Sequence, residues 1–139
     1  MARIIYVEDD DLMGAVVKDI LTTAGHLIGV VPHGGLGADT VAFKKPDLAL
    51  VDLTLPGISG IEVIKHLRRS SGTHLMPILV LTGDRRPSAS EEAMGAGAND
   101  VMTKPFSPED LVARVAQVLS ENPFSARSDS ARSTAASSS

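Results

Sequence analysis

The chain has 139 residues, 43% of them hydrophobic, and a formal net charge of −4 at pH 7. That length and composition are typical of one folded domain and exclude a disordered chain. Because the sequence contains no cysteine, disulfide bonds and cysteine-bound metals are excluded as well.

No apolar run reaches the ~20 residues that cross a bilayer, and residues 1–10 lack a signal-peptide pattern. We therefore expect a cytoplasmic protein that does not bind membranes. The acidic balance also argues against direct binding of nucleic acid by this chain, because phosphate binding usually needs a basic patch.

The first β-strand is expected at Arg3–Val7, a branched apolar stretch. A helix should follow, because an apolar residue recurs at every fourth position and predicts its buried face. The residues of this stripe are Leu12, Val16, Ile20 and Ala24. Gly25 is expected to end the helix, and the second strand is expected at Leu27–Val31.

A second helix should come next, and we interpret the glycines near its start as turn residues. They are Gly34, Gly35 and Gly37. The third strand is expected at Asp47–Val51, directly before Asp52. A third helix follows, with apolar residues at helical spacing. They are Ile61, Ile64 and Leu67.

The fourth strand, Pro77–Leu81, leads into Thr82 and Gly83, and the fifth, Asn99–Thr103, leads into Lys104. The last helix has a clear start, with Ser107 as N-cap, Pro108 in its first position and acidic residues after it. Its inward stripe is Leu111, Val115, Val118 and Leu119.

The end of the chain differs in kind from the rest. Residues 123–139 are mostly Ser, Ala and Arg, which cannot bury enough surface to offset the cost of ordering. We therefore expect a folded domain over residues 1–122 and a flexible Ser/Ala-rich tail or linker over residues 123–139.

Strands that alternate with helices predict an α/β fold: a doubly wound parallel sheet with helices on both faces. Polar side chains follow four of its five strands: Glu8 and Asp9, Asp52, Thr82, and Lys104. Ligands of such sheets bind where the carboxyl ends of the strands meet. We therefore expect these five side chains to lie together at one edge.

Carboxylates crowded at this edge would repel one another. At ~4 Å and an effective dielectric constant of ~20, each pair costs about 4 kcal/mol. A raised pKa or a bound cation must compensate, and an all-oxygen site favours Mg²⁺, with Mn²⁺ also possible. Beside a cation and Lys104, Asp52 has the setting of a nucleophile that forms an aspartyl phosphate. An acidic run after a strand is also commonly a helix cap, a role we expect for Asp10 or Asp11.

The sequence resembles the receiver domains of bacterial response regulators over residues 2–121. The matching segments are IIYVEDD, LALVDLTLPGISGIEV, ILVLTG and GANDVMTKPF. The spacings also fit: 43 residues from Asp9 to Asp52, 30 more to Thr82 and 22 more to Lys104. The resemblance implies a flavodoxin-like fold of five parallel strands in the order 2-1-3-4-5, with five helices.

The resemblance also implies that Asp52 accepts a phosphoryl group from a histidine kinase or a histidine phosphotransfer protein. Glu8, Asp9 and Asp52 would hold Mg²⁺ together with the backbone carbonyl of Thr54. Thr82 and Lys104 would bind the phosphoryl oxygens, and the Lys104–Pro105 peptide bond would be cis. The protein would be a switch that acts on a downstream protein and not a turnover enzyme.

The sequence departs from the family pattern at two positions. Val101 stands where the family usually has a Tyr or Phe whose rotamer reports phosphorylation, and Gly83 stands where a small residue, commonly Ala, follows the threonine. An alternative function is therefore a pseudo-receiver, a binding module that does not switch by phosphorylation. A phosphatase of the haloacid dehalogenase type is rejected, because Thr54 stands where that class needs a second Asp. Two arrangements remain open: a single-domain regulator, or a receiver truncated before an output domain.

Overall fold

The computed structural model describes residues 1–122, so the predicted tail lies outside the described residues. Strands and helices alternate in the expected order. They are β1 (Arg3–Val7), α1 (Asp11–Thr23), β2 (Leu27–Val31), α2 (Gly34–Lys44), β3 (Leu48–Val51), α3 (Gly60–Arg69), β4 (Ile78–Thr82), α4 (Pro87–Ala96), β5 (Asp100–Thr103) and α5 (Pro108–Glu121). No helix within residues 1–122 is long and apolar enough to span a membrane.

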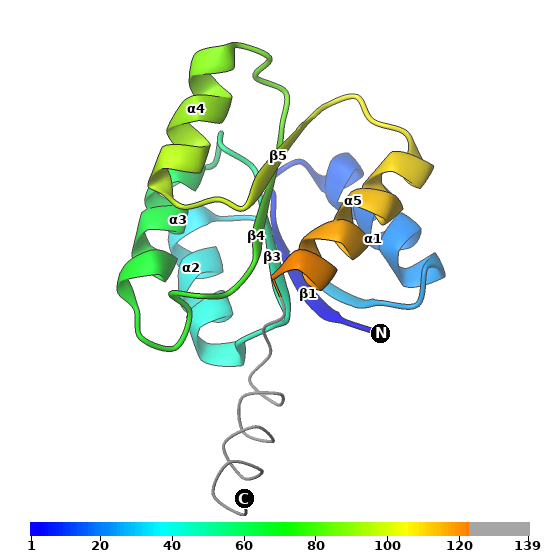
Figure 1. Ribbon diagram of the computed structural model, residues 1–139, viewed down its shortest axis with the longest axis horizontal. Helices are drawn as coiled ribbons and strands as arrows, with labels where there is room; N and C mark the ends of the chain where they lie inside the picture. The colour runs from blue at the N-terminus through cyan, green and yellow to red at the C-terminus, as the bar shows by residue number, and fades with distance from the viewer. Residues whose placement is uncertain (123–139) are drawn as a thin grey trace, which may run out of the picture.

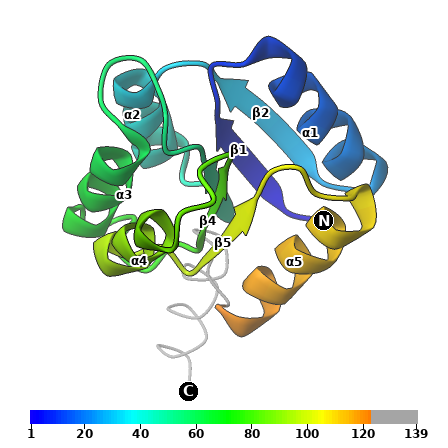
Figure 2. The ribbon, with the colours of Figure 1, turned by 90° about the horizontal axis from the view of Figure 1, so that it is seen from above.

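The five strands form one parallel sheet in the order β2-β1-β3-β4-β5, as predicted. Helices α2, α3 and α4 cover one face of this sheet, and α1 and α5 cover the other (Figure 1). The same two layers of helices are seen when the molecule is turned by 90° (Figure 2). Each face has its own core of mostly aliphatic side chains, so the central strands β1, β3 and β4 are buried on both sides.

Three strands start one residue later than the sequence pattern predicts, so that Asp47, Pro77 and Asn99 lie just before them. The carboxylate of Asp47 accepts the backbone N–H of Arg3 at 2.8 Å, and the amide oxygen of Asn99 accepts that of Ile78 at 2.7 Å. Pro77 has no N–H to donate. These shifts leave the carboxyl ends of the strands, where the candidate site lies, close to their expected places.

The predicted buried face of α1 is wrong except at Ile20, which is half-buried against the core. Leu12 and Val16 are exposed, at 74% and 42%, whereas Val17 and Leu21 are fully buried. Residues exactly four apart drift around a helix with 3.6 residues per turn. The face that meets the sheet is the one containing Gly14, where an added Cβ would lie 3.1 Å from Val30. The predicted end is confirmed: Gly25 has φ 96° directly after the C-cap.

The prediction for α5 is confirmed. The hydroxyl of Ser107 accepts the backbone N–H of Asp110 at 3.1 Å, and Pro108 opens the helix. Three members of the predicted stripe are buried and the fourth packs against the same core; they are Leu111, Val115, Val118 and Leu119. In α3, Ile64 and Leu67 are likewise fully buried.

The glycines of α2 are not turn residues, which corrects the sequence-based interpretation. Gly34, Gly35 and Gly37 lie within the helix, and Gly34 and Gly37 are buried. A Cβ on Gly37 would lie 2.6 Å from Cγ1 of Val7, and one on Gly34 would overlap the carbonyl oxygen of Ile58. Their missing side chains let α2 pack closely against β1 and against the loop that follows Asp52.

Candidate functional site

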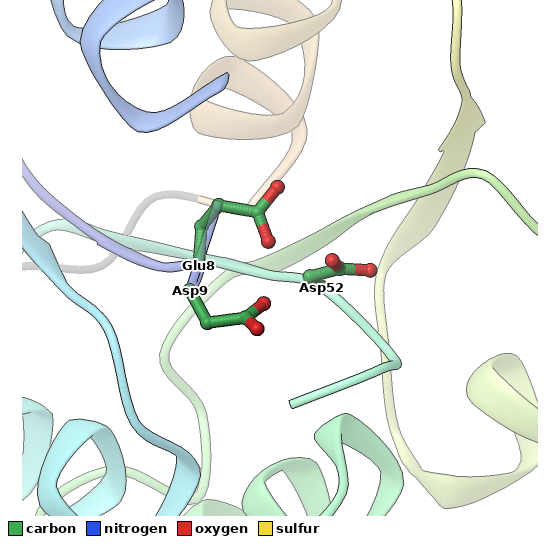
Figure 3. A group of neighbouring side chains, drawn as sticks. All are labelled: Glu8, Asp9 and Asp52. Carbon is green, nitrogen blue, oxygen red and sulfur yellow. The ribbon is translucent and has the colours of Figure 1, made fainter. Parts of the chain in front are cut away.

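Three carboxylates meet at the carboxyl edge of the sheet, where β1 and β3 end side by side. Glu8 and Asp9 follow β1, and Asp52 follows β3; their carboxyl groups gather around a common space (Figure 3). One oxygen of each lies within 4.8 Å of the others. The backbone holds this arrangement, because the N–H of Asp52 donates to the carbonyl of Val7 at 3.1 Å, and that of Glu8 to Val31 at 3.0 Å.

The three carboxylates differ in their access to water. Glu8 is 1% exposed and Asp52 is 8% exposed, whereas Asp9 lies at the surface. Glu8 therefore forms the buried side of the cluster and Asp9 its exposed side, with Asp52 more exposed than Glu8.

Lys104 places its ammonium group among these carboxylates. Its Nζ lies 2.6 Å from Oε1 of Glu8 and 3.5 Å from Oδ2 of Asp52. The backbone N–H of Lys104 donates to the carbonyl of Thr82 at 2.8 Å, which fixes the loop after β5, and the Lys104–Pro105 peptide bond is cis. Three carboxyl groups thus share this one ammonium group.

The Glu8 carboxylate is held on one oxygen only. The Tyr6 hydroxyl donates to Oε1 at 3.1 Å, beside Lys104, while Oε2 is buried and has no hydrogen-bond partner. Burial, followed by the adjoining Asp52, raises the pKa of Glu8 to about 7, and Lys104 opposes this shift. Burial and the Glu8 charge also raise the pKa of Tyr6 above its usual range, so its hydroxyl stays protonated and donates.

A hard divalent cation fits this donor set. A buried carboxylate oxygen without a partner is costly, and a bound cation would satisfy it. Glu8, Asp9 and Asp52 supply only oxygen donors from a partly open site, which suits an ion that keeps several of its waters, such as Mg²⁺. The acidic cluster is therefore a candidate metal centre.

The other predicted site residues lie around this cluster. Thr82 is 1% exposed, and its hydroxyl oxygen accepts the backbone N–H of Asp84 at 3.1 Å. The backbone N–H of Thr54 points to Oδ1 of Asp52 at 3.4 Å. A Cβ on Gly83 would meet no atom within 4 Å, so this glycine leaves open space beside the site and is not required by packing.

Val101 lies away from the carboxylates, on β5 beside Val80 of β4, and packs against the core under α2, α3 and α4. Two residues further along β5, Thr103 pairs with Thr82. Val101 is half-buried, and its side chain has no ring to exchange between inward and outward positions.

Sequence reasoning missed two residues that shape the site. Gly60, in the first position of α3, lies so close to Asp52 that a Cβ there would overlap the Asp52 carbonyl oxygen. The sequence pattern places Tyr6 in a strand and assigns it no other role. Its signal was available, because residues two apart on a strand share a face, and Tyr6 stands two residues before Glu8.

Known proteins are similar to this chain in sequence. The family description "Response regulator receiver domain" matches residues 4–116. The transcriptional regulatory protein YrkP of Bacillus subtilis is 42% identical over 113 residues, which are 81% of this chain and 47% of YrkP. The DNA-binding response regulator MtrA of Mycolicibacterium smegmatis is 37% identical over 120 residues, 86% of this chain and 51% of MtrA. The chain thus spans about half the length of these two relatives.

Solved structures of response regulators have a similar fold. The chemotaxis response regulator CheY4 of Vibrio cholerae superposes with a TM-score of 0.81 at 28% identity, over 86% of this chain and 99% of CheY4. The BeF3-activated N-terminal receiver domain of Klebsiella pneumoniae RstA gives a TM-score of 0.77 at 31% identity, over 84% and 97% of the two chains. The strand order and the acidic edge define a CheY-like fold. The chain belongs to the response regulator receiver domain family of two-component signalling systems.

Proposed function

We propose that Asp52 is the phosphoacceptor of this receiver domain and that its Mg²⁺-dependent phosphorylation switches the binding of a partner protein. The observation that carries the proposal is the position of Asp52, 8% exposed, between the Lys104 ammonium group and two further carboxylates. The phosphoryl donor would be a histidine kinase or a histidine phosphotransfer protein, in the cytoplasm, as is typical of the family.

In the transfer step, a carboxylate oxygen of Asp52 forms a bond to phosphorus while the phosphorus–nitrogen bond of the donor histidine breaks and the imidazole leaves. Glu8, Asp9 and Asp52 would hold Mg²⁺, with the backbone carbonyl of Thr54 as a further ligand. The bound ion would neutralise charge on the carboxylates and on the phosphoryl oxygens. Asp52 lies 3.5 Å from Lys104 and is more exposed than Glu8, the other carboxylate that contacts this lysine.

Lys104 and Thr82 would bind the phosphoryl oxygens. Lys104 is already 3.5 Å from Asp52 and needs only to exchange its contact with Glu8 for a phosphoryl oxygen. The Thr82 hydroxyl has a proton to donate, because in its present contact with Asp84 it acts as acceptor. Gly83 leaves the space beside the phosphoryl group open.

The signal would leave through the segment after Thr82. Movement of the Thr82 hydroxyl toward a phosphoryl oxygen would release the N–H of Asp84 and shift the loop that leads into α4. Because Val101 has no ring, we propose that the change is confined to residues 83–97. A bias of about 1–3 kcal/mol would change partner affinity by about 5- to 150-fold.

We propose a receiver domain over residues 1–122, followed by a flexible Ser/Ala-rich tail or linker over residues 123–139. Partners would bind the receiver domain itself, and we propose no nucleic-acid contact by this chain. The pseudo-receiver alternative rests on Val101 alone and is not favoured, because the acidic cluster and Lys104 are complete.

Intact-mass spectrometry with acetyl phosphate and Mg²⁺ tests the proposal. Wild-type protein should gain one phosphoryl group, and the Asp52→Asn variant should gain none. Equal gains in both proteins would place the phosphorylation elsewhere. No gain in either, with Mg²⁺ shown to bind, would support the pseudo-receiver.

A further inference from the structure

Tyr6 is buried beneath the site, on the face of the sheet covered by α1 and α5. Its side chain is 0% exposed and belongs to the core cluster that includes Val17, Leu21 and Leu111. From this position its hydroxyl reaches Oε1 of Glu8 at 3.1 Å. The ring is enclosed by core side chains, so the hydroxyl is a fixed donor.

Two donors of different mobility therefore share one oxygen of Glu8. The Tyr6 hydroxyl is locked by the core, whereas the ammonium group of Lys104, 2.6 Å from the same oxygen, ends a flexible side chain. The other oxygen, Oε2, has no donor. If Lys104 moves away, Tyr6 is the only group within residues 1–122 that still donates a hydrogen bond to the Glu8 side chain.

Phosphorylation of Asp52, which is part of the proposed function, would require Lys104 to move away from Glu8. A phosphoryl group on Asp52 would attract Lys104, which would then leave Glu8. Without Tyr6, Oε1 of Glu8 would then be a buried oxygen with no hydrogen-bond donor, which is costly even when a cation binds the carboxylate. Glu8 would bear this cost, or would turn away from the cation, if Tyr6 did not remain bound to it.

We propose that Tyr6 is a positioning residue that holds Glu8 in place while Lys104 transfers from Glu8 to the phosphoryl group. A purely structural role differs in its consequences. If the Tyr6 hydroxyl simply takes the nearest acceptor as part of core packing, its removal lowers stability and leaves ligand binding unchanged.

The Tyr6→Phe variant separates the two roles, because it keeps the ring and removes the donor. The measured quantities are the affinity for beryllofluoride at saturating Mg²⁺, by ¹⁹F NMR, and the affinity for Mg²⁺ alone, by calorimetry. We expect beryllofluoride to bind about 5- to 20-fold more weakly to the variant, because Oε1 of Glu8 keeps Lys104 as a donor in the free variant and loses its last donor only when beryllofluoride is bound. Equal beryllofluoride affinity in variant and wild type would overturn the proposal.

Thr73→Val is the matched control. Thr73 is also buried, at 1% exposure, and its hydroxyl donates to the carbonyl of Leu67 at 2.6 Å, in the segment between α3 and β4. This variant loses a buried hydroxyl in the segment before β4, at the edge of the sheet opposite to the carboxyl ends of the strands. It should lower the melting temperature and change beryllofluoride affinity by less than twofold. A loss of affinity as large as that of Tyr6→Phe would show a general effect of instability and overturn the proposal.

Wild-type protein provides a second measurement that does not depend on a variant folding. Tyr6 is the only tyrosine of the chain, so tyrosine labelled with ¹³C at Cζ gives one signal. On addition of beryllofluoride, departure of Lys104 should strengthen the Tyr6–Glu8 hydrogen bond and shift this signal downfield. An unchanged signal with beryllofluoride bound would overturn the positioning role alone. Failure of wild-type protein to bind beryllofluoride would overturn both this role and the proposed function.

Discussion

Lys104 is closer to Glu8 than to Asp52: its Nζ lies 2.6 Å from Oε1 of Glu8 and 3.5 Å from Oδ2 of Asp52. The Lys104 ammonium group thus lies beside the most buried carboxylate, Glu8, and makes the longer contact with Asp52, the proposed phosphoacceptor. Lys104 compensates charge that a divalent ion would otherwise neutralise.

The first prediction follows from this competition. Lys104→Ala should bind Mg²⁺ about 3- to 10-fold more tightly than wild type, because an ammonium group that repels the ion is removed. Calorimetry at pH 7.5 measures the change. Lys65→Ala is the control, since Lys65 is an exposed residue on α3 paired with Glu62 at 3.9 Å, and it should leave Mg²⁺ affinity unaltered. Weaker binding by Lys104→Ala would show that the lysine organises the site and does not compete with the ion.

Two adjacent aspartates should behave differently, and this is the second prediction. Asp9→Ala should abolish both Mg²⁺ binding and phosphorylation, because it removes one of three candidate ligands. Asp10→Ala should cost about 1 kcal/mol of folding free energy and keep phosphorylation, since Asp10 caps α1 by accepting the N–H of Met13 at 3.0 Å. Urea denaturation and intact-mass spectrometry measure the two effects. Normal phosphorylation of Asp9→Ala in the presence of chelator would contradict the metal role.

The third prediction concerns pH. The pKa of Glu8 rises from its usual 4.5 to about 7 on folding. The stability contributed by this raised pKa is fully present below about pH 4.5 and is lost as the pH rises through about 7. In chelator, the free energy of unfolding of wild type should therefore fall between pH 5 and pH 8 more than that of Glu8→Gln. Urea titrations at several pH values measure it, and parallel curves for the two proteins would refute the assignment.

The fourth prediction tests the close packing of α2. Gly37→Ala should lower stability by about 1–3 kcal/mol, because the added Cβ would meet Cγ1 of Val7 at 2.6 Å. Gly95→Ala, in α4, meets no atom within 4 Å and should be neutral or stabilising by up to about 1 kcal/mol. Chemical denaturation measures both. Equal effects at the two glycines would show that α2 can move away from β1 at little cost.

The fifth prediction locates the switch. Hydrogen exchange with and without beryllofluoride should differ over residues 83–97, after the Thr82–Asp84 contact, and should change little at Val101. Val101→Tyr, which restores an aromatic side chain, should extend the changed region into β5. Unchanged exchange over residues 83–97, with the mimic bound at Asp52, would favour the pseudo-receiver.

The fold and the location of the site were predictable, because both depend on patterns along the chain. Alternating strands and helices predict the parallel sheet, and the strand-end rule brings Glu8, Asp9, Asp52 and Lys104 together. Other features depend on which surfaces meet. The buried side of α1 follows from the contact of Gly14 with Val30, and the need for Gly37 follows from the position of Val7. Neither contact has a signature in local sequence.

The preference of Lys104 for Glu8 could not be predicted for a related reason. Strand ends place the two backbones near each other, but several rotamers of a long side chain remain possible until its neighbours are known. The shared oxygen on Glu8 depends on Tyr6, which approaches from the core and not from the site.

The outward position of Leu12 and Val16 has an evolutionary consequence. Since these two side chains contribute little to the core, the outer side of α1 can change its residues at small cost in folding free energy. A gene duplicate of this domain could thus diversify its α1 surface and acquire a different recognition specificity, while the sheet and its acidic edge stay as they are.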